Sequence, residues 1–215
     1  MHKVVVALFG AAAFATGSAA SAGITLTGNV PGVSPYSGPA PTYTFDPGSR
    51  PTVSGGAFVT GTNGILYAQP YGSSGYYYAV GPSTNTTGTI DLSSFGDITS
   101  LSFLWGSVDS YNTLEFLDAG MNILATFTGN DIFNPATGSR TDPNTNPIVT
   151  FSLTGSDVSN FSYLRLISTS NAFEIDNLTI GAVPEPASWA LMLLGFGGIG
   201  LALRRRRNPG LAQLA

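Results

Sequence analysis

Apolar and polar residues alternate along several short segments in the middle of the chain. In residues 100–105 the apolar side chains Leu101, Phe103 and Trp105 all fall on one face of an extended backbone. The segment DAGMN at 118–122 separates two such runs and has the composition of a tight turn. This period of two predicts β-strands with one buried face rather than amphipathic helices.

The same pattern recurs along most of the chain. Glycine (27 residues) and proline (14 residues) are abundant, which is typical of many short strands joined by turns. We therefore predict an all-β fold, an antiparallel two-sheet β-sandwich of the jelly-roll or lectin-like type that spans residues 23–182. Its strands are expected at residues 43–46, 57–60, 75–80, 89–92, 100–105, 112–117, 123–127, 148–153, 161–168 and 172–180.

The last of these strands contains a slip in its alternation. Phe173 and Ile175 share one face, but Leu178 returns to that face one residue later than strict alternation requires. A β-bulge adds one residue to a strand and so moves the later side chains back into register. The pattern therefore predicts a bulge at Asp176 and Asn177.

The N-terminal segment has the pattern of a secretory signal peptide. A short basic start, MHK, precedes an apolar run at 4–15, and Ala20 and Ala22 supply the small residues of a cleavage site before Gly23. A short buried N-terminal helix is the alternative. We predict a signal peptide over residues 1–22, so that the exported chain starts at Gly23.

A change in composition marks the C-terminal segment. Pro-Glu-Pro at 184–186 cannot lie inside a helix or a central strand, which predicts an extended, accessible linker. Residues 187–203 carry no charge and would form a helix of about 25 Å, at the short end of what crosses a bilayer core of about 30 Å. The four arginines at 204–207 then place this end in the cytoplasm and residues 23–183 outside.

Each part of this segment also has another interpretation. Four arginines can form a solvated face or a nucleic-acid patch, and a glycine-rich apolar stretch can be a buried core helix or a signal-like segment. GFGGIG at 195–200 matches the pattern of a dinucleotide-binding turn. That turn needs a preceding strand, a following soluble helix and an acidic residue about 20 positions later, and none of these is present in the sequence. The order of linker, apolar span and basic stop favours a transmembrane helix with a cytoplasmic extension at 208–215.

This segment resembles the C-terminal tail of PEP-CTERM proteins, which are bacterial exported proteins. The resemblance implies that exosortase, a membrane protease-transpeptidase, recognises the tail at 183–207 and cuts it near the Pro-Glu-Pro motif. The outer part would then pass from the inner membrane to the cell surface or the extracellular matrix. No catalytic residue is implied in this chain, because the nucleophile belongs to exosortase. The resemblance rests on Pro184, Glu185, Pro186, Ala187 and Trp189 as the sorting motif, and on Arg204, Arg205, Arg206 and Arg207 as the cytoplasmic stop.

Charge argues against nucleic acid as a partner of the exported part. Residues 23–183 hold three arginines (Arg50, Arg140 and Arg165) and eleven carboxylates, which leaves a formal charge of −8. A nucleic-acid-binding domain is expected to carry a basic patch instead.

The residue types of the exported part also limit its chemistry. Residues 23–183 contain no histidine, cysteine or lysine. This excludes a Ser-His-Asp catalytic triad, a Cys-His catalytic pair and a histidine-ligated zinc ion. Carboxylate pairs remain for catalysis, with Asp109 and Glu115 or Glu174 and Asp176 as the nearest pairs in sequence. Such spacing also suits a solvated strand face, so we expect no enzyme.

A second resemblance concerns residues 106–116 and 171–178. They are similar to the outer domain of a set of exosortase-dependent surface proteins whose jelly roll is lectin-like. The resemblance implies a structural calcium ion with Asp176 as a ligand. The alternative is that Asp176 and Asn177 only satisfy the bulged backbone. DPNTN at 142–146 resembles the start of a calcium loop, but it lacks the following glycine and the bidentate glutamate, which favours turn chemistry.

Three consecutive tyrosines suggest a ligand site. Because successive side chains of a strand point to opposite faces, at least one of Tyr76, Tyr77 and Tyr78 is expected to be exposed. A flat aromatic face near Asn and Asp suits a saccharide, and the alternative is a core or amphipathic surface role. Two hypotheses follow: a non-enzymatic surface or matrix protein, structural or associated with extracellular polysaccharide, and a carbohydrate-binding module of the cell surface or biofilm matrix.

Overall fold

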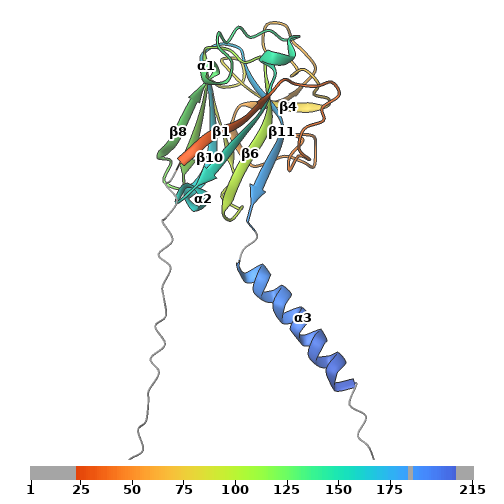
Figure 1. Ribbon diagram of the computed structural model, residues 1–215. Coiled ribbons are helices and arrows are strands. Elements are labelled where there is room, and N and C mark those ends of the chain that lie inside the picture. Colours follow the sequence, from red (N-terminus) through yellow and green to blue (C-terminus); the bar gives the residue numbers. More distant parts are fainter. Residues whose placement is uncertain (1–22, 184–185, 207–215) are drawn as a thin grey trace, which may run out of the picture.

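A computed structural model describes residues 23–183 and the helix at 186–206. In the first of these ranges most of the regular secondary structure is β-strand (Figure 1). Its strands are β1 (Gly23–Val30), β2 (Val53–Gly55), β3 (Ala57–Thr60), β4 (Tyr76–Val80), β5 (Thr87–Asp91), β6 (Ile98–Gly106), β7 (Asn112–Asp118), β8 (Ile123–Thr128), β9 (Ile148–Thr154), β10 (Phe161–Ser168) and β11 (Phe173–Ala182). The helices are α1 (Gly129–Ile132), α2 (Asp157–Asn160) and α3 (Pro186–Arg206), with a 3-10 turn at Pro143–Thr145.

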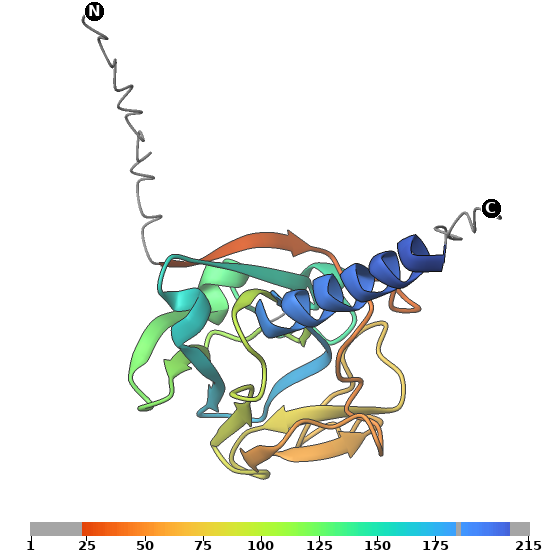
Figure 2. The ribbon, with the colours of Figure 1, turned by 90° about the horizontal axis from the view of Figure 1, so that it is seen from below.

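The strands form two antiparallel sheets, as predicted. One sheet has the order β1-β9-β6-β11-β4-β3 and the other has the order β2-β5-β10-β7-β8. In Figure 2, β1 (red) and the pair β3 and β4 (orange and yellow) lie at opposite sides of the molecule, at the two edges of the first sheet. The pairs β4–β11, β5–β10, β6–β9 and β7–β8 are nested, so the chain from β4 to β11 is a long antiparallel ribbon rolled over two sheets. This nested pairing is the topology of a jelly roll.

The core lies between the two sheets and is rich in aromatic side chains. Leu101, Phe103 and Trp105 are fully buried, as the alternation predicted. Trp105 stacks on Phe173 with ring centroids 4.3 Å apart. From the opposite sheet, Phe116 meets the ring of Phe151 at 5.1 Å. The predicted period of two thus selects the residues that join the sheets.

The predicted β-bulge is confirmed. The register of β11 against β6 shifts between Asp176 and Thr179. Asn177 adopts φ 55°, a left-handed conformation that asparagine tolerates better than most residues. Leu178 then exchanges two backbone hydrogen bonds with Tyr43, which fills the gap in the ladder. The extra residue returns Leu178 to the core, where it is fully buried.

The prediction of a strand at residues 43–46 is wrong. Only Tyr43 pairs, as an isolated bridge to Leu178. Phe45 has φ 59°, which is incompatible with an extended strand, although its side chain is fully buried. Two strands, β1 and β2, were not predicted. The apolar alternation that predicts a strand is present in β1, because Ile24 and Leu26 lie on one face and pack on the core.

β6 connects the two ends of the sandwich. Its first residue, Ile98, pairs with Ala182 where β11 ends, and its last residue, Gly106, pairs with Glu174 where β11 begins. Figure 1 shows that β1 begins and β11 ends at the same lower end of the sandwich. Eight residue steps of a strand span about 26 Å, so the start of β11 lies at the far end from α3.

The helix α3 follows the sandwich and exposes its apolar side chains. Leu191, Leu194 and Phe196 are 71%, 72% and 67% exposed. Within the part of the chain that the structure describes, no helix has both the length and the apolar character needed to cross a membrane. The predicted transmembrane helix is therefore not confirmed. The predicted signal peptide at 1–22, with Ala20 and Ala22, lies outside the described residues.

Candidate functional site

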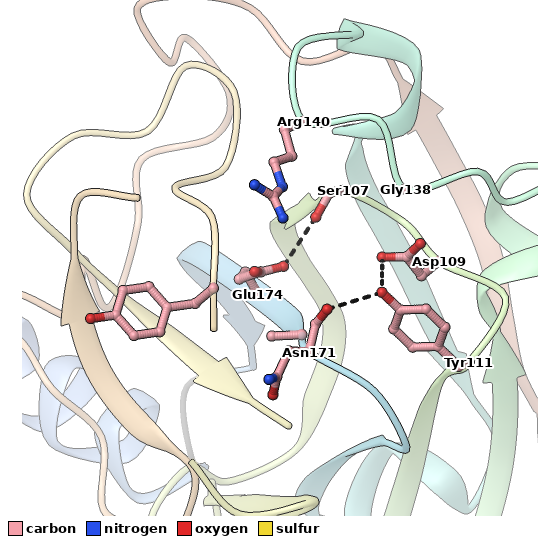
Figure 3. Close-up of a pocket in the computed structure, with 9 residues that line it drawn as sticks. Ser107, Asp109, Tyr111, Gly138, Arg140, Asn171 and Glu174 are labelled. Atoms are coloured by element: carbon pink, nitrogen blue, oxygen red, sulfur yellow. Dashed lines mark hydrogen bonds between the residues drawn. The ribbon is translucent and has the colours of Figure 1, made fainter. Parts of the chain in front are cut away.

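A small polar pocket lies at the end of the sandwich where β6 ends and β11 begins (Figure 3). Its volume is about 60 Å³, and most of its lining residues are polar or charged. Four chain segments meet there: the β6–β7 connection, the β8–β9 loop, the β10–β11 loop and the loop before β4. The residues that define its chemistry are Ser107, Asp109, Tyr111, Arg140, Asn171 and Glu174.

Glu174 forms the floor of the pocket. Its neighbours Phe173 and Ile175 enter the core, so alternation turns Glu174 to the opposite face of the sheet. There the Ala68 N–H donates to its Oε1 at 2.7 Å, and the Ser107 hydroxyl donates to its Oε2 at 3.2 Å. The residue is only 1% exposed. Burial disfavours the charged form and raises the pKa of Glu174 to about 7.

Asp109 is the second carboxylate of the pocket. The Tyr111 hydroxyl donates to its Oδ2 at 2.8 Å and lies 3.1 Å from the Asn171 carbonyl oxygen. Burial raises the pKa of Asp109, while the hydrogen bond from Tyr111 lowers it. Gly138 has φ 63°, and a Cβ atom at this position would collide with the Asp109 carboxylate. The loop therefore needs glycine at 138 to close over Asp109.

Arg140 brings a positive charge to the same pocket. Its Nη2 donates to the Gly64 carbonyl oxygen at 2.8 Å, and in Figure 3 its guanidinium group lies on the side of Ser107 and Glu174. The charge lowers the pKa of both Asp109 and Glu174. No ion pair within 4.0 Å joins Arg140 to either carboxylate among the described residues. The guanidinium group thus lies near both carboxylates but forms no ion pair with either of them in the described part of the chain.

The carboxylate pairs suggested by sequence spacing are not the pair that the fold assembles. Glu115 lies directly opposite Arg165 across β7 and β10, and its Oε2 accepts a hydrogen bond from Arg165 Nε at 2.6 Å. Glu174 instead shares its pocket with Asp109, which is 65 positions away in sequence. No spacing rule along the chain could have found this pair.

Asp176 shares the outer face of β11 with Glu174 but lies in a different environment. Its Oδ1 accepts the Asn177 N–H at 2.7 Å, so it satisfies the bulged backbone. Burial raises the pKa of Asp176 to about 7, the Ser73 hydrogen bond lowers it, and the charge of Asp46 raises it further. The described residues contain no cluster of three or more His, Cys, Asp or Glu side chains that could hold a metal ion. The calcium ligand role of Asp176 stays a prediction.

The segment at 142–146 uses its polar residues for turn chemistry. Asp142 is the N-cap of the 3-10 turn, and its Oδ1 accepts the Asn144 N–H at 2.9 Å. Asn146 is fully buried, and its Oδ1 accepts the backbone N–H groups of Tyr71 and Ser107 at 3.1 and 2.9 Å. These bonds fix the β6–β7 connection that carries the pocket residues.

Only one of the three predicted ligand tyrosines is not fully buried. Tyr77 and Tyr78 are fully buried, and their hydroxyls donate to the carbonyl oxygens of Gly61 and Gly55. Tyr76 is half-buried, and the Arg50 guanidinium lies 4.7 Å from its ring centroid. Tyr76 is thus the only one of the three that reaches the surface, while Tyr77 and Tyr78 cannot present a face to a saccharide.

The sorting segment begins where the sandwich ends. The Val183 N–H donates to the Asp97 carbonyl oxygen at 2.8 Å, which is the last interaction of the sandwich backbone. Pro184 and Glu185 lie outside the described residues, and α3 begins at Pro186, where proline is favoured because the first helical N–H needs no partner. The helix also contains Ala187 and Trp189. It ends with Arg204, Arg205 and Arg206, while Arg207 lies outside the described residues.

Comparison with known proteins identifies this segment. A segment of this kind is a C-terminal sorting signal, which is found in exported proteins. Residues 182–207 match the family model of the PEP-CTERM protein-sorting motif, so the chain carries this motif at its C-terminal segment. No match was found among curated proteins or among solved structures.

Proposed function

We propose that this chain is an exported surface protein whose β-sandwich becomes part of the cell surface or extracellular matrix after exosortase removes the tail. The observation that carries the proposal is the PEP-CTERM motif at residues 182–207, which implies export, sorting to the surface and exosortase as the processing partner. We assign the outer domain a non-enzymatic role, structural or in association with extracellular polysaccharide. Its lack of histidine, cysteine and lysine supports this assignment.

The position of the motif fits removal without damage to the sandwich. The eleven strands of the described residues all end by Ala182, and the Val183 N–H then bonds the Asp97 carbonyl oxygen. A cut at residues 184–186 therefore leaves both sheets and the whole core in the released part. Before the cut, we propose, the tail holds the precursor at the inner membrane. This stage rests on the sequence, in which residues 187–203 are uncharged and four arginines follow.

Replacing Glu185 by alanine tests the sorting proposal. We expect the wild-type protein recovered from the cell surface to lack residues 189–207, and the Glu185→Ala protein to keep them and to stay in the membrane fraction. The physical reason is that the Glu185 carboxylate is the only charge in the Pro-Glu-Pro motif. Mass spectrometry of the surface and membrane fractions gives the C-terminal peptide of each form.

The matched control is Asp97→Ala. It removes an exposed carboxylate next to the point where the tail leaves the sandwich, but leaves the Asp97 backbone carbonyl that accepts from Val183. Its processing should equal that of the wild type. Surface material that still contains Trp189 to Arg207 would contradict the proposal.

The second candidate function is a carbohydrate-binding module with the same export route. The observation that favours it is the polar pocket around Glu174, which lies at the opposite end of β11 from the tail. A pocket at that end stays accessible whether or not the tail is attached.

A further inference from the structure

We propose that the pocket formed by Ser107, Asp109, Arg140 and Glu174 binds the edge of a neutral, hydroxyl-rich ligand, the terminal sugar of an uncharged polysaccharide. The proposal deepens the second candidate function and rests on it. It does not depend on the sorting route, which is tested by the fate of residues 189–207.

The size and lining of the pocket set the scale of its ligand. Its volume is about 60 Å³, and most of the residues that line it are polar or charged. Such a space holds a few water molecules, since a cavity needs about 10–15 Å³ of this accessible volume to hold one. It is too small for a whole sugar ring, but it accepts two or three hydroxyl groups from the edge of one. An apolar ligand would gain nothing from walls of this kind.

The pocket has both hydrogen-bond acceptors and hydrogen-bond donors that are available to a ligand. A carboxylate can accept about four hydrogen bonds. Among the described residues, Glu174 accepts two and Asp109 accepts one from side chains or backbone. A guanidinium group has five N–H donors, of which Arg140 uses one, on the Gly64 carbonyl oxygen. Acceptors and donors therefore converge on the same small space.

The charges of the pocket select against charged ligands. An anionic group would meet the carboxylates of Asp109 and Glu174, and a cationic group would meet the guanidinium of Arg140. A sugar hydroxyl donates one hydrogen bond and accepts others, so neighbouring hydroxyls can bond a carboxylate and an arginine together. A neutral polyol is thus the ligand whose chemistry matches the two carboxyl groups and the guanidinium group together.

The pocket residues are held in place before any ligand arrives. Tyr111 and Gly138 fix the Asp109 carboxylate, and the Ala68 N–H fixes Glu174. Fixed polar groups lower the entropy cost of binding. Asn171 is not a free contact, because its side chain already bonds Ser83 and the Ile65 carbonyl oxygen.

Retention on immobilised polysaccharides tests the proposal with the protein released at the cell surface. The neutral probes are dextran, mannan and galactan, and the charged probes are alginate (anionic) and chitosan (cationic). We expect retention on at least one neutral probe. Asp109→Asn and Arg140→Gln should each weaken it by at least about tenfold, because a hydrogen bond to a charged group is among the stronger polar contacts. Asp157→Asn, an acid of α2 away from the pocket, should bind like the wild type.

A second measurement on the wild-type protein guards against variants that fail to fold. Oligosaccharides cut from the retained polysaccharide should shift the backbone amide NMR signals of Ala68 and Ser107, which both contact Glu174. The proposal is overturned if no neutral probe retains the protein, if only alginate or chitosan does, or if these two amides do not respond. Any of these outcomes leaves the sorting proposal untouched.

Discussion

Replacing Trp105 by alanine is expected to lower the free energy of unfolding of the sandwich by about 3–5 kcal/mol, the range for large buried aromatic residues. Trp105 is fully buried, stacks on Phe173 at 4.3 Å and lies 6.1 Å from the ring of Phe103. Alanine would leave a cavity in the core that lies between the two sheets. Urea denaturation of the wild-type and variant proteins, followed by fluorescence or circular dichroism, measures the difference.

Trp105→Phe is the matched control for this experiment. The Trp105 Nε1 has no hydrogen-bond partner among the described residues, so phenylalanine removes an unsatisfied buried N–H while it keeps an aromatic ring. Its cost should be clearly smaller than that of alanine. A loss below about 1 kcal/mol for Trp105→Ala would show that this part of the core does not hold the sheets together.

The stability of the sandwich is expected to fall as pH rises from about 4 to about 7. Burial raises the pKa of Glu174 from 4.5 to about 7 and the pKa of Asp176 from 3.8 to about 7. Between these values the folded protein binds more protons than the unfolded chain, so rising pH favours unfolding. The loss is complete above about pH 7. For Glu174 alone it is on the order of 3 kcal/mol, since one pKa unit is worth about 1.4 kcal/mol.

Glu174→Gln separates the contribution of this residue from the rest. An amide of the same shape keeps an acceptor for the Ala68 N–H but does not titrate. The variant should show a flatter dependence on pH, and at pH 8 its free energy of unfolding should exceed that of the wild type. Asp157→Asn should retain the wild-type slope. Denaturation series at pH 5 and pH 8 suffice, and equal slopes for wild type and Glu174→Gln would refute the assignment.

The sequence was sufficient to predict the sandwich because burial of one face imposes a period of two. It also predicted the bulge, since Leu178 returns to the core one residue late. It failed at residues 43–46, where Phe45 is buried from a left-handed backbone conformation rather than from a strand. Apolar alternation cannot distinguish these two ways of burying a side chain.

The pocket was beyond the reach of sequence patterns. Asp109, Arg140 and Glu174 come from three separate connections or strand ends, and each alone looks like an ordinary polar residue near a turn. Only the nested pairing of the jelly roll brings these segments to one end. The sorting tail is the opposite case, because its signal is contiguous in sequence and needs no tertiary structure to be found.

The direction of β11 places the pocket and the C-terminal tail at different ends of the domain. Glu174 lies near the start of β11, and the tail follows the last residue of β11. Measured along the paired strand β6, these two positions are about 26 Å apart. The pocket and the point where the tail leaves therefore lie at opposite ends of the sandwich. A ligand in the pocket would therefore not compete for space with whatever holds the chain at its C-terminal end.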